Sequence, residues 1–173
     1  MNLKDKIRTI PDFPIEGIMF RDITTLLQDK DAFKQTCDEL YRRYKDRNID
    51  VVVGIESRGF IFGSVLAYNP GVGFVPIRKP GKLPAKTIKE EYKLEYGKDA
   101  VEIHEDAIKK GDNVLIIDDL IATGGTVCAA CRLIEKLGGK VEELAFVIEL
   151  PDLKGRDKIK GYKIFSMVEF EGE

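Results

Sequence analysis

Two acidic residues followed by a segment rich in threonine and glycine form the most chemically informative stretch of the sequence. The apolar run Val114–Ile117 precedes Asp118 and Asp119, and the segment Ala122–Thr126 reads Ala-Thr-Gly-Gly-Thr. Glycines allow close backbone approach, and successive N–H groups at the start of a helix favour an anion. Carboxylates accept hydrogen bonds from hydroxyl groups or bind a metal ion. One end of the stretch therefore suits a phosphate and the other suits hydroxyls or a metal, as a sugar 5-phosphate would require.

A second turn, Gly54–Gly59, carries Arg58 near its tip, where it suits a phosphate or diphosphate. Its glycine spacing matches half of a P-loop, but Phe60 and Ile61 stand where a P-loop needs Lys and Ser or Thr, so a nucleoside triphosphatase is not supported. A purely structural turn is the alternative for both segments. The paired carboxylates favour a binding site in the stretch Asp118–Thr126, whereas Gly54–Gly59 taken alone leaves both interpretations open.

Residues 78–93 form a basic segment within a chain whose net charge is slightly negative. The chain has 28 Lys and Arg against 30 Asp and Glu, for a net charge of −2. Proteins that bind a nucleic-acid backbone are usually basic overall, so a small, highly anionic ligand explains the segment better than DNA, with a solvated charged face as the alternative. Its prolines and glycine offer few apolar anchors, so we expect residues 79–93 to be mobile without ligand. The basic residues are Arg78, Lys79, Lys82, Lys86, Lys89 and Lys93.

The remaining reactive residues argue against several other classes of protein. His104 is the single histidine, which removes most zinc sites and a Ser-His-Asp hydrolase. Three cysteines are an odd number for a disulfide framework and favour a reducing cytoplasm. Cys128 and Cys131 fall one turn apart in a predicted helix, which indicates a buried helix face rather than a metal site. The start, residues 1–6, lacks the apolar stretch of a signal peptide, and no apolar run is long enough to span a membrane.

Alternating strands and helices must position these residues. With 173 residues, the chain is expected to form one domain. Alternation over residues 88–96, followed by the apolar residues of 101–103, predicts a hairpin that carries the loop 78–86. The pattern as a whole predicts an α/β fold with a mostly parallel central sheet flanked by helices, and ligands of such sheets lie at the carboxyl ends of the strands. Strands are predicted at 50–55, 72–77, 114–117, 141–149 and 162–168, and helices at 30–47, 60–68 and 126–137.

The segment Val114–Thr126 resembles the phosphoribosyl pyrophosphate (PRPP) binding motif of type I phosphoribosyltransferases, and nearly the whole chain resembles the adenine phosphoribosyltransferases of bacteria. Ala122 stands where hypoxanthine-guanine enzymes usually carry an acidic residue, and orotate enzymes usually begin the acidic pair with Glu. Further matching segments are Phe13-Pro14, Gly17–Ile23, Glu56–Phe60, Arg78–Pro84, Leu94–Gly97 and Lys154–Arg156.

The resemblance implies a transferase of purine salvage that makes AMP and pyrophosphate from adenine and PRPP. It implies a type I phosphoribosyltransferase fold over residues 1–173, with a small N-terminal hood in 1–28 and a flexible catalytic hairpin, or lid, in 78–97. Mg²⁺ would be held mainly through PRPP rather than in a protein cage. The enzyme would be a cytoplasmic homodimer, with adenine and PRPP as its partners and neither nucleic acid nor membrane among them.

The resemblance also implies a role for each matched position. Asp118 and Asp119 would hold the ribose hydroxyls. The loop that would bind the 5-phosphate consists of Ala122, Thr123, Gly124, Gly125 and Thr126. The cations that would face the pyrophosphate are Arg58, Arg78, Lys79 and Lys82. The residues that would contact adenine are Phe20, Arg21 and Leu150. The residues implied in catalysis are Glu95 and Tyr96, for proton transfer and shielding, together with Arg58 and Lys79. Family members often have a non-proline cis peptide at Glu56–Ser57, so we expect one here.

Two other functions share much of this pattern. PRPP-sensing regulators keep the fold and the ligand but carry an added DNA-binding domain, and only residues 1–12 precede Phe13, which is too few for such a domain. A sister transferase for xanthine or another base is the second alternative. The hood residues Phe20 and Arg21, and the small side chain of Ala122, favour adenine.

Overall fold

The computed structural model describes residues 1–94 and 96–172, and its centre is a five-stranded, fully parallel sheet. The strand order is β4-β3-β7-β8-β9. β3 is buried along its whole length, as its Val-Val-Val-Gly-Ile sequence predicts for a strand covered on both faces. The predicted α/β fold is therefore confirmed. The strands are β3 (Val51–Ile55), β4 (Gly73–Ile77), β7 (Asn113–Ile121), β8 (Lys140–Glu149) and β9 (Ile164–Glu169).

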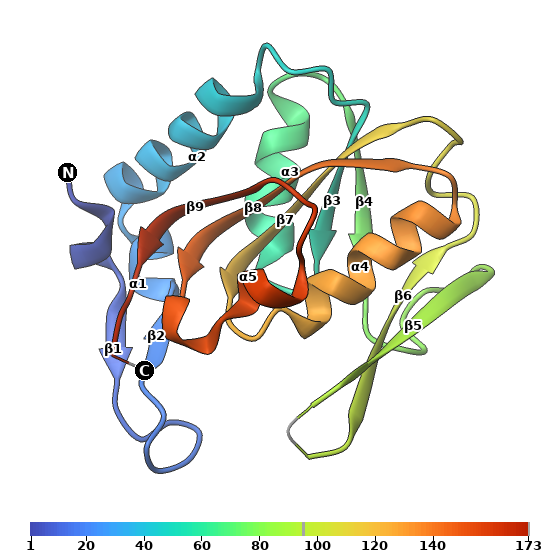
Figure 1. Cartoon of the computed structure of the whole chain (residues 1–173). Helices are drawn as coiled ribbons and strands as arrows, with labels where there is room; N and C mark the ends of the chain where they lie inside the picture. Colours follow the sequence, from blue (N-terminus) through green and yellow to red (C-terminus); the bar gives the residue numbers. More distant parts are fainter. Residues whose placement is uncertain (95, 173) are drawn as a thin grey trace.

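Helices cover both faces of the sheet (Figure 1). α2 (Lys30–Tyr44) and α3 (Gly59–Tyr68) pack on one face, and α4 (Gly125–Lys136) packs on the other. Successive side chains of β7 alternate between the two cores: Leu115 lies with the α2 and α3 residues, and Ile116 lies with those of α4. The two buried layers hold β7 in the middle of the molecule.

Two small antiparallel hairpins flank the sheet. One pairs β1 (Arg8–Ile10) with β2 (Phe20–Asp22), and the other pairs β5 (Thr87–Lys93) with β6 (Lys98–His104). Figure 1 shows both hairpins extending past the edge at which the parallel strands end, one on each side. The carboxyl edge of the sheet therefore lies between them. The remaining short elements are η1 (Leu3–Lys6), α1 (Thr24–Gln28), η2 (Pro151–Leu153) and α5 (Gly155–Lys158).

The structure corrects two details of the sequence-based prediction. β7 does not end before the acidic pair but continues to Ile121, because β8 extends alongside it and Leu120 pairs with Ile148. The alternating face of the hairpin ends at Lys93, so Leu94 and Tyr96 are exposed instead of continuing that face.

The cysteines and the histidine occupy structural positions. Cys128 and Cys131 lie on α4; Cys131 is fully buried, and burial raises the pKa of its thiol well above the usual range. The predicted buried helix face is confirmed for Cys131, whereas Cys128 is half-buried. His104 ends β6, and its Nε2 accepts a hydrogen bond from the Ala85 N–H at 3.3 Å. Across residues 1–94 and 96–172, no helix is long and apolar enough to cross a membrane.

Candidate active site

The glycine-rich loop 122–126 connects the end of β7 to the start of α4 at the carboxyl edge of the sheet. Gly124 has φ +82° and serves as the N-cap of α4, which begins at Gly125, one residue before the predicted start. The loop surrounds a cavity of about 180 Å³. Free N–H groups at a helix start beside such a cavity suit an anion of phosphate size. The cavity is lined by Asp118, Leu120, Ile121, Ala122, Thr123, Gly124, Gly125, Thr126, Val127 and Phe146.

A direct contact between two backbone segments holds this loop in place. A Cβ atom on Gly155 would lie 2.4 Å from the Ala122 carbonyl oxygen, and one on Gly124 would lie 2.6 Å from the Gly155 carbonyl oxygen. Arg156 anchors the segment, because its Nε and Nη2 each donate to the Glu149 carboxylate at 2.6 Å. Glu149 is buried, and these hydrogen bonds hold the pKa of its carboxyl below the usual range. The segment Lys154–Arg156, which is one of the segments that match the family, therefore supports the glycine-rich loop 122–126.

The acidic pair lies on β7 just before the loop. Asp119 is buried, and its Oδ2 accepts a hydrogen bond from Arg58 Nε at 2.5 Å. Asp118 is less enclosed, and its Oδ1 accepts a hydrogen bond from the Asp119 N–H at 2.8 Å. Desolvation, followed by the neighbouring Asp119 charge, raises the pKa of Asp118 well above the usual range. The turn at Arg58 and the acidic pair, which are far apart in the sequence, therefore form one site.

Close packing brings the two segments together. A Cβ atom on Gly59 would lie 2.8 Å from the Ile117 carbonyl oxygen and 3.1 Å from Asp118 Oδ1, so only glycine lets α3 start this near to β7. The Glu56–Ser57 peptide bond is cis, as the resemblance led us to expect. The hydrogen bond of Arg58 to Asp119 and the close packing at Gly59 favour the functional interpretation of Gly54–Gly59 over a turn with a solvated arginine.

The first part of the basic segment, residues 78–82, folds back onto Glu56. Arg78 Nε lies 3.4 Å from Glu56 Oε2, and the backbone N–H of Lys79 donates to the same oxygen at 2.8 Å. Lys82 forms an ion pair with the other carboxylate oxygen. Although burial opposes ionisation, these contacts hold the pKa of Glu56 below the usual range. The side chain of Lys79 differs from the others, because it turns to the hairpin and contacts Tyr92 and Asp99.

The residues predicted to contact a base are split between the N-terminal hairpin and β8. Phe20 lies on β2 with its ring edge-on to Phe13, at a centroid distance of 5.1 Å. Arg21 donates to Thr9 Oγ1 at 2.6 Å. Leu150 is buried directly after β8.

The structure describes one of the two residues that the resemblance implies in proton transfer and shielding. Tyr96 is 87% exposed near the end of the β5–β6 hairpin. Glu95 lies outside the described residues, so its predicted role stays a prediction. Tyr92 and Asp99, in contrast, reach Lys79 without having been predicted, because no local sequence pattern indicates a contact between a loop and a hairpin strand.

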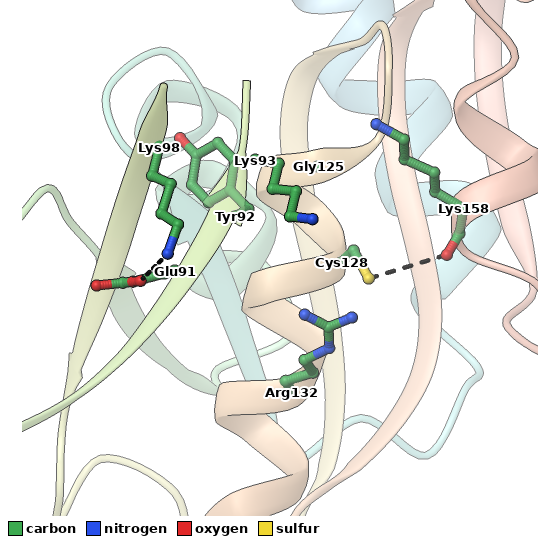
Figure 2. Close-up of a pocket in the computed structure, with 8 residues that line it drawn as sticks. All are labelled: Glu91, Tyr92, Lys93, Lys98, Gly125, Cys128, Arg132 and Lys158. Carbon is green, nitrogen blue, oxygen red and sulfur yellow. Dashed lines mark hydrogen bonds and ion pairs between the residues drawn. The ribbon is translucent and has the colours of Figure 1, made fainter. Parts of the chain in front are cut away.

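A larger cavity, of about 480 Å³, adjoins the loop on the side of the hairpin. Figure 2 shows Lys93 and Arg132 directed into the space between the hairpin, α4 and α5. Sequence reasoning did not predict this cavity, since its basic residues come from separate segments. It is lined by Glu91, Tyr92, Lys93, Lys98, Gly125, Cys128, Arg132 and Lys158.

Comparison with known proteins identifies the family. The model of the phosphoribosyl transferase domain matches residues 24–173. An adenine phosphoribosyltransferase of Desulfosudis oleivorans is 63% identical over 173 residues, which are 100% of both chains. The chain belongs to the adenine phosphoribosyltransferase family. A second family member, from Clostridium perfringens, is 60% identical over 171 residues, or 99% of each chain.

Solved structures of the adenine phosphoribosyltransferase family share the fold closely. The crystal structure from Thermoanaerobacter pseudethanolicus has a TM-score of 0.94 and 52% identity, covering 97% of this chain and 98% of its own. The enzyme from Saccharomyces cerevisiae has a TM-score of 0.90 and 44% identity, covering 96% of both chains.

The contact between Gly155 and the loop predicts a specific sensitivity to an added methyl group. In Gly155→Ala, the new Cβ would overlap the Ala122 carbonyl oxygen, so the loop must move. We expect PRPP affinity to fall at least about tenfold and the free energy of unfolding to fall by about 1–3 kcal/mol, which is typical of overpacking. Calorimetric titration and thermal unfolding measure the two effects.

Gly73→Ala is the matched control, because a Cβ there would have Val51 Cγ2 as its nearest neighbour, at an ordinary 3.9 Å. It should keep wild-type PRPP affinity. Unchanged PRPP affinity in Gly155→Ala would contradict the view that this contact positions the loop.

Proposed function

We propose that this protein transfers the 5-phosphoribosyl group from PRPP to adenine, giving AMP and pyrophosphate in purine salvage. The observation that carries the proposal is the position of the acidic pair, beside a glycine-rich helix start on one side and Arg58 on the other. A 5-phosphate, a ribose and a diphosphate occur in that order in PRPP. The residues predicted for these three parts follow the same order along the carboxyl edge of the sheet.

The residues present suit the chemistry of this transfer. The N–H groups of the loop 122–126 would bind the 5-phosphate, and Asp118 and Asp119 would accept hydrogen bonds from the ribose hydroxyls. Positive charge develops on the sugar as the diphosphate leaves, as in other glycosyl transfers. Arg58, with the cations of residues 78–82, would stabilise the departing diphosphate, so the reaction needs no covalent nucleophile.

Magnesium fits this site as an ion carried mainly by the substrate. Asp118 and Asp119 offer the oxygen ligands that Mg²⁺ prefers, but Asp119 is already bonded to Arg58. Within the described ranges, no group of three His, Cys, Asp or Glu residues could hold a metal. When bound, the ion would neutralise charge on the pyrophosphate oxygens. Its remaining ligands would be PRPP oxygens and water.

Adenine is the base we assign to the second substrate. Phe20 and Arg21 on the N-terminal hairpin and Leu150 after β8 would enclose it. Relatives support this assignment: the Saccharomyces cerevisiae enzyme was crystallised with adenine and an imino-altritol bisphosphate, and the Giardia lamblia enzyme with 9-deazaadenine. Ala122 has no polar side chain to contact a ring nitrogen, which disfavours hypoxanthine and guanine.

The experiment that tests the function mixes purified protein with PRPP, Mg²⁺ and one purine at a time. We expect AMP and pyrophosphate from adenine, and at least about a hundredfold lower rate with hypoxanthine, guanine or xanthine, since a mismatched polar base leaves buried groups unpaired. Faster turnover of xanthine would support the sister-transferase alternative. Absence of product with every base would overturn the proposal.

The two carboxylates give the first prediction of this proposal. Asp118→Asn and Asp119→Asn keep the side-chain shape but weaken acceptance from the ribose hydroxyls. Losing a charge-assisted hydrogen bond costs about 1.5–3 kcal/mol, or roughly ten- to a hundredfold in kcat/KM for PRPP. Steady-state kinetics measure this loss. Asp46→Asn, at an exposed turn after α2, is the control and should behave as wild type. Wild-type kinetics in both site variants would remove the assignment to the ribose.

The basic hairpin gives the second prediction. We propose that residues 79–93 close over bound PRPP and Mg²⁺ and exclude water that would compete with adenine. Hydrogen exchange in these residues should slow when PRPP, Mg²⁺ and an unreactive adenine analogue are added. Glu95→Ala should lower kcat more than it weakens PRPP binding, because the residue would act after the sugar is bound, whereas Glu91→Ala should not. Equal exchange in both states would contradict closure.

Assembly gives the third prediction. We propose that the enzyme is a cytoplasmic homodimer, as its family implies; its three free cysteines suit a reducing compartment. Light scattering at micromolar concentration should therefore give a particle of about twice the 19.5 kDa chain mass. A particle of one chain mass would contradict the dimer.

A further inference from the structure

The ammonium group of Lys79 is bound by two side chains of the β5–β6 hairpin. Lys79 Nζ donates to Tyr92 Oη at 2.8 Å and forms an ion pair with the Asp99 carboxylate. The Tyr92 hydroxyl donates to Asp99 Oδ2 at 2.9 Å, so the three polar groups form a closed ring of hydrogen bonds. The hydrogen bond from Lys79 is the largest cause that holds the pKa of Asp99 below the usual range. We call these residues the Lys79 cluster.

The Lys79 cluster joins three separate segments of the chain. Lys79 lies in the basic loop after β4, Tyr92 on β5 and Asp99 on β6, where Tyr92 and Asp99 are register partners. The hairpin strand is also fixed to the start of that loop, because the backbones of Arg78 and Glu102 exchange hydrogen bonds of 3.0 and 2.7 Å. The position of the Lys79 ammonium therefore depends on the hairpin.

Tyr92 connects the Lys79 cluster to the glycine-rich loop. A Cβ atom on Gly125 would lie 3.2 Å from Tyr92 Cδ2, so the ring packs against the start of α4. Figure 2 shows the ring beside Gly125, with its hydroxyl on the side away from Arg132 and Lys158. The Tyr92 ring thus contacts the loop proposed to bind the 5-phosphate. Its hydroxyl contacts Lys79, which is proposed to bind the pyrophosphate.

We propose that Asp99 and Tyr92 are positioning residues for the leaving diphosphate: they hold Lys79 at the hairpin until pyrophosphate oxygens displace Asp99 from its ammonium. This inference rests on the proposed function. Asp99 and a diphosphate are both negatively charged, and both pair with the Lys79 ammonium. Binding of the diphosphate therefore exchanges the Lys79–Asp99 ion pair for one between Lys79 and the diphosphate. The exchange frees the Lys79 ammonium from the hairpin at the moment the diphosphate is bound, and it reduces the net gain in affinity from Lys79.

The solvent exposure of Lys79 and Asp99 sets the size of the change in pyrophosphate affinity that we expect when Asp99 is replaced. The side chains of Lys79 and Asp99 are 38% and 34% exposed, so their ion pair belongs with the weaker, partly solvated pairs. The pair Lys98–Glu91, at 3.6 Å, joins the two hairpin strands without involving Lys79, and its side chains are 66% and 56% exposed. Glu91→Gln therefore removes the same charge from the same hairpin and serves as the matched control.

The test is calorimetric titration of Mg²⁺ and pyrophosphate into the full-length protein and its variants. Asp99→Asn should bind pyrophosphate about two- to fivefold more tightly than wild type, the range expected for a partly exposed ion pair. Tyr92→Phe, which keeps the ring against Gly125, should show a smaller gain. Asp99→Glu restores the charge and should return the affinity to that of wild type, while Glu91→Gln should not change it.

Two further measurements separate positioning from a general structural effect. In a Lys79→Ala background, Asp99→Asn should no longer raise pyrophosphate affinity, because the cation for which both anions compete is gone. In the forward reaction, Asp99→Asn should lower KM for PRPP without raising kcat. If Asp99 had only a structural role, Asp99→Asn would instead change the midpoint of thermal unfolding and would not lower KM while leaving kcat unchanged.

Three results would overturn the inference. The first is that Asp99→Asn binds pyrophosphate more weakly than wild type. The second is that Asp99→Asn raises pyrophosphate affinity no more than Glu91→Gln does. The third is that Asp99→Asn still raises pyrophosphate affinity in the Lys79→Ala background. If the wild type makes AMP while any of these holds, the proposed function stands and only the role of Asp99 fails. A wild type that makes no AMP would overturn both.

Discussion

The parallel pairing of β7 with β3 and β8 fixes almost every residue of the proposed PRPP site. β7 is buried on both faces, so hydrophobic packing fixes the strand in the middle of the molecule, and its pairing with β8 carries it through the acidic pair to Ile121. Because β3 ends at the same edge, the turn at Arg58 lies beside Asp119. Because β8 ends there as well, Glu149 can hold Arg156 and, through it, Gly155 against the loop. The site is precise because rigid neighbouring strands, rather than loops alone, support it.

Electrostatic pairing is the second constraint on this site. Each cation predicted to face pyrophosphate is paired with a carboxylate: Arg58 with Asp119, Arg78 and Lys82 with Glu56, and Lys79 with Asp99. Unpaired cations gathered at one edge would repel one another, and the carboxylates remove that cost. A diphosphate bound at the proposed site would therefore replace existing carboxylate partners. Specificity for a diphosphate over a single phosphate would then arise because only a diphosphate has enough charged oxygens to pair with several of these cations at once.

The sequence allowed much of the fold to be predicted, because buried parallel strands appear as short apolar runs. It did not indicate that β7 continues through Asp118 and Asp119, since the polar residues interrupt the apolar pattern while hydrogen bonding to β8 continues. The strands β1 and β2 have three residues each, too few for a visible alternation. Contacts across long sequence distances, such as Gly155 with Ala122, follow from tertiary packing and have no local signature.

The same limit applies to the segment 79–93, for which the sequence predicts mobility but not the contact of Tyr92 and Asp99 with Lys79. Its composition is polar, and composition alone favours solvation. Yet the register of β5 with β6 places Tyr92 opposite Asp99, and a lysine from the preceding loop completes the group. Val101 and Ile103 anchor the base of the hairpin in the buried core, and the Lys79 cluster adds polar contacts farther along the hairpin that a charged substrate can replace. Such contacts suit a closing element better than apolar packing, because an anion can exchange with a carboxylate but cannot displace a buried hydrophobic side chain.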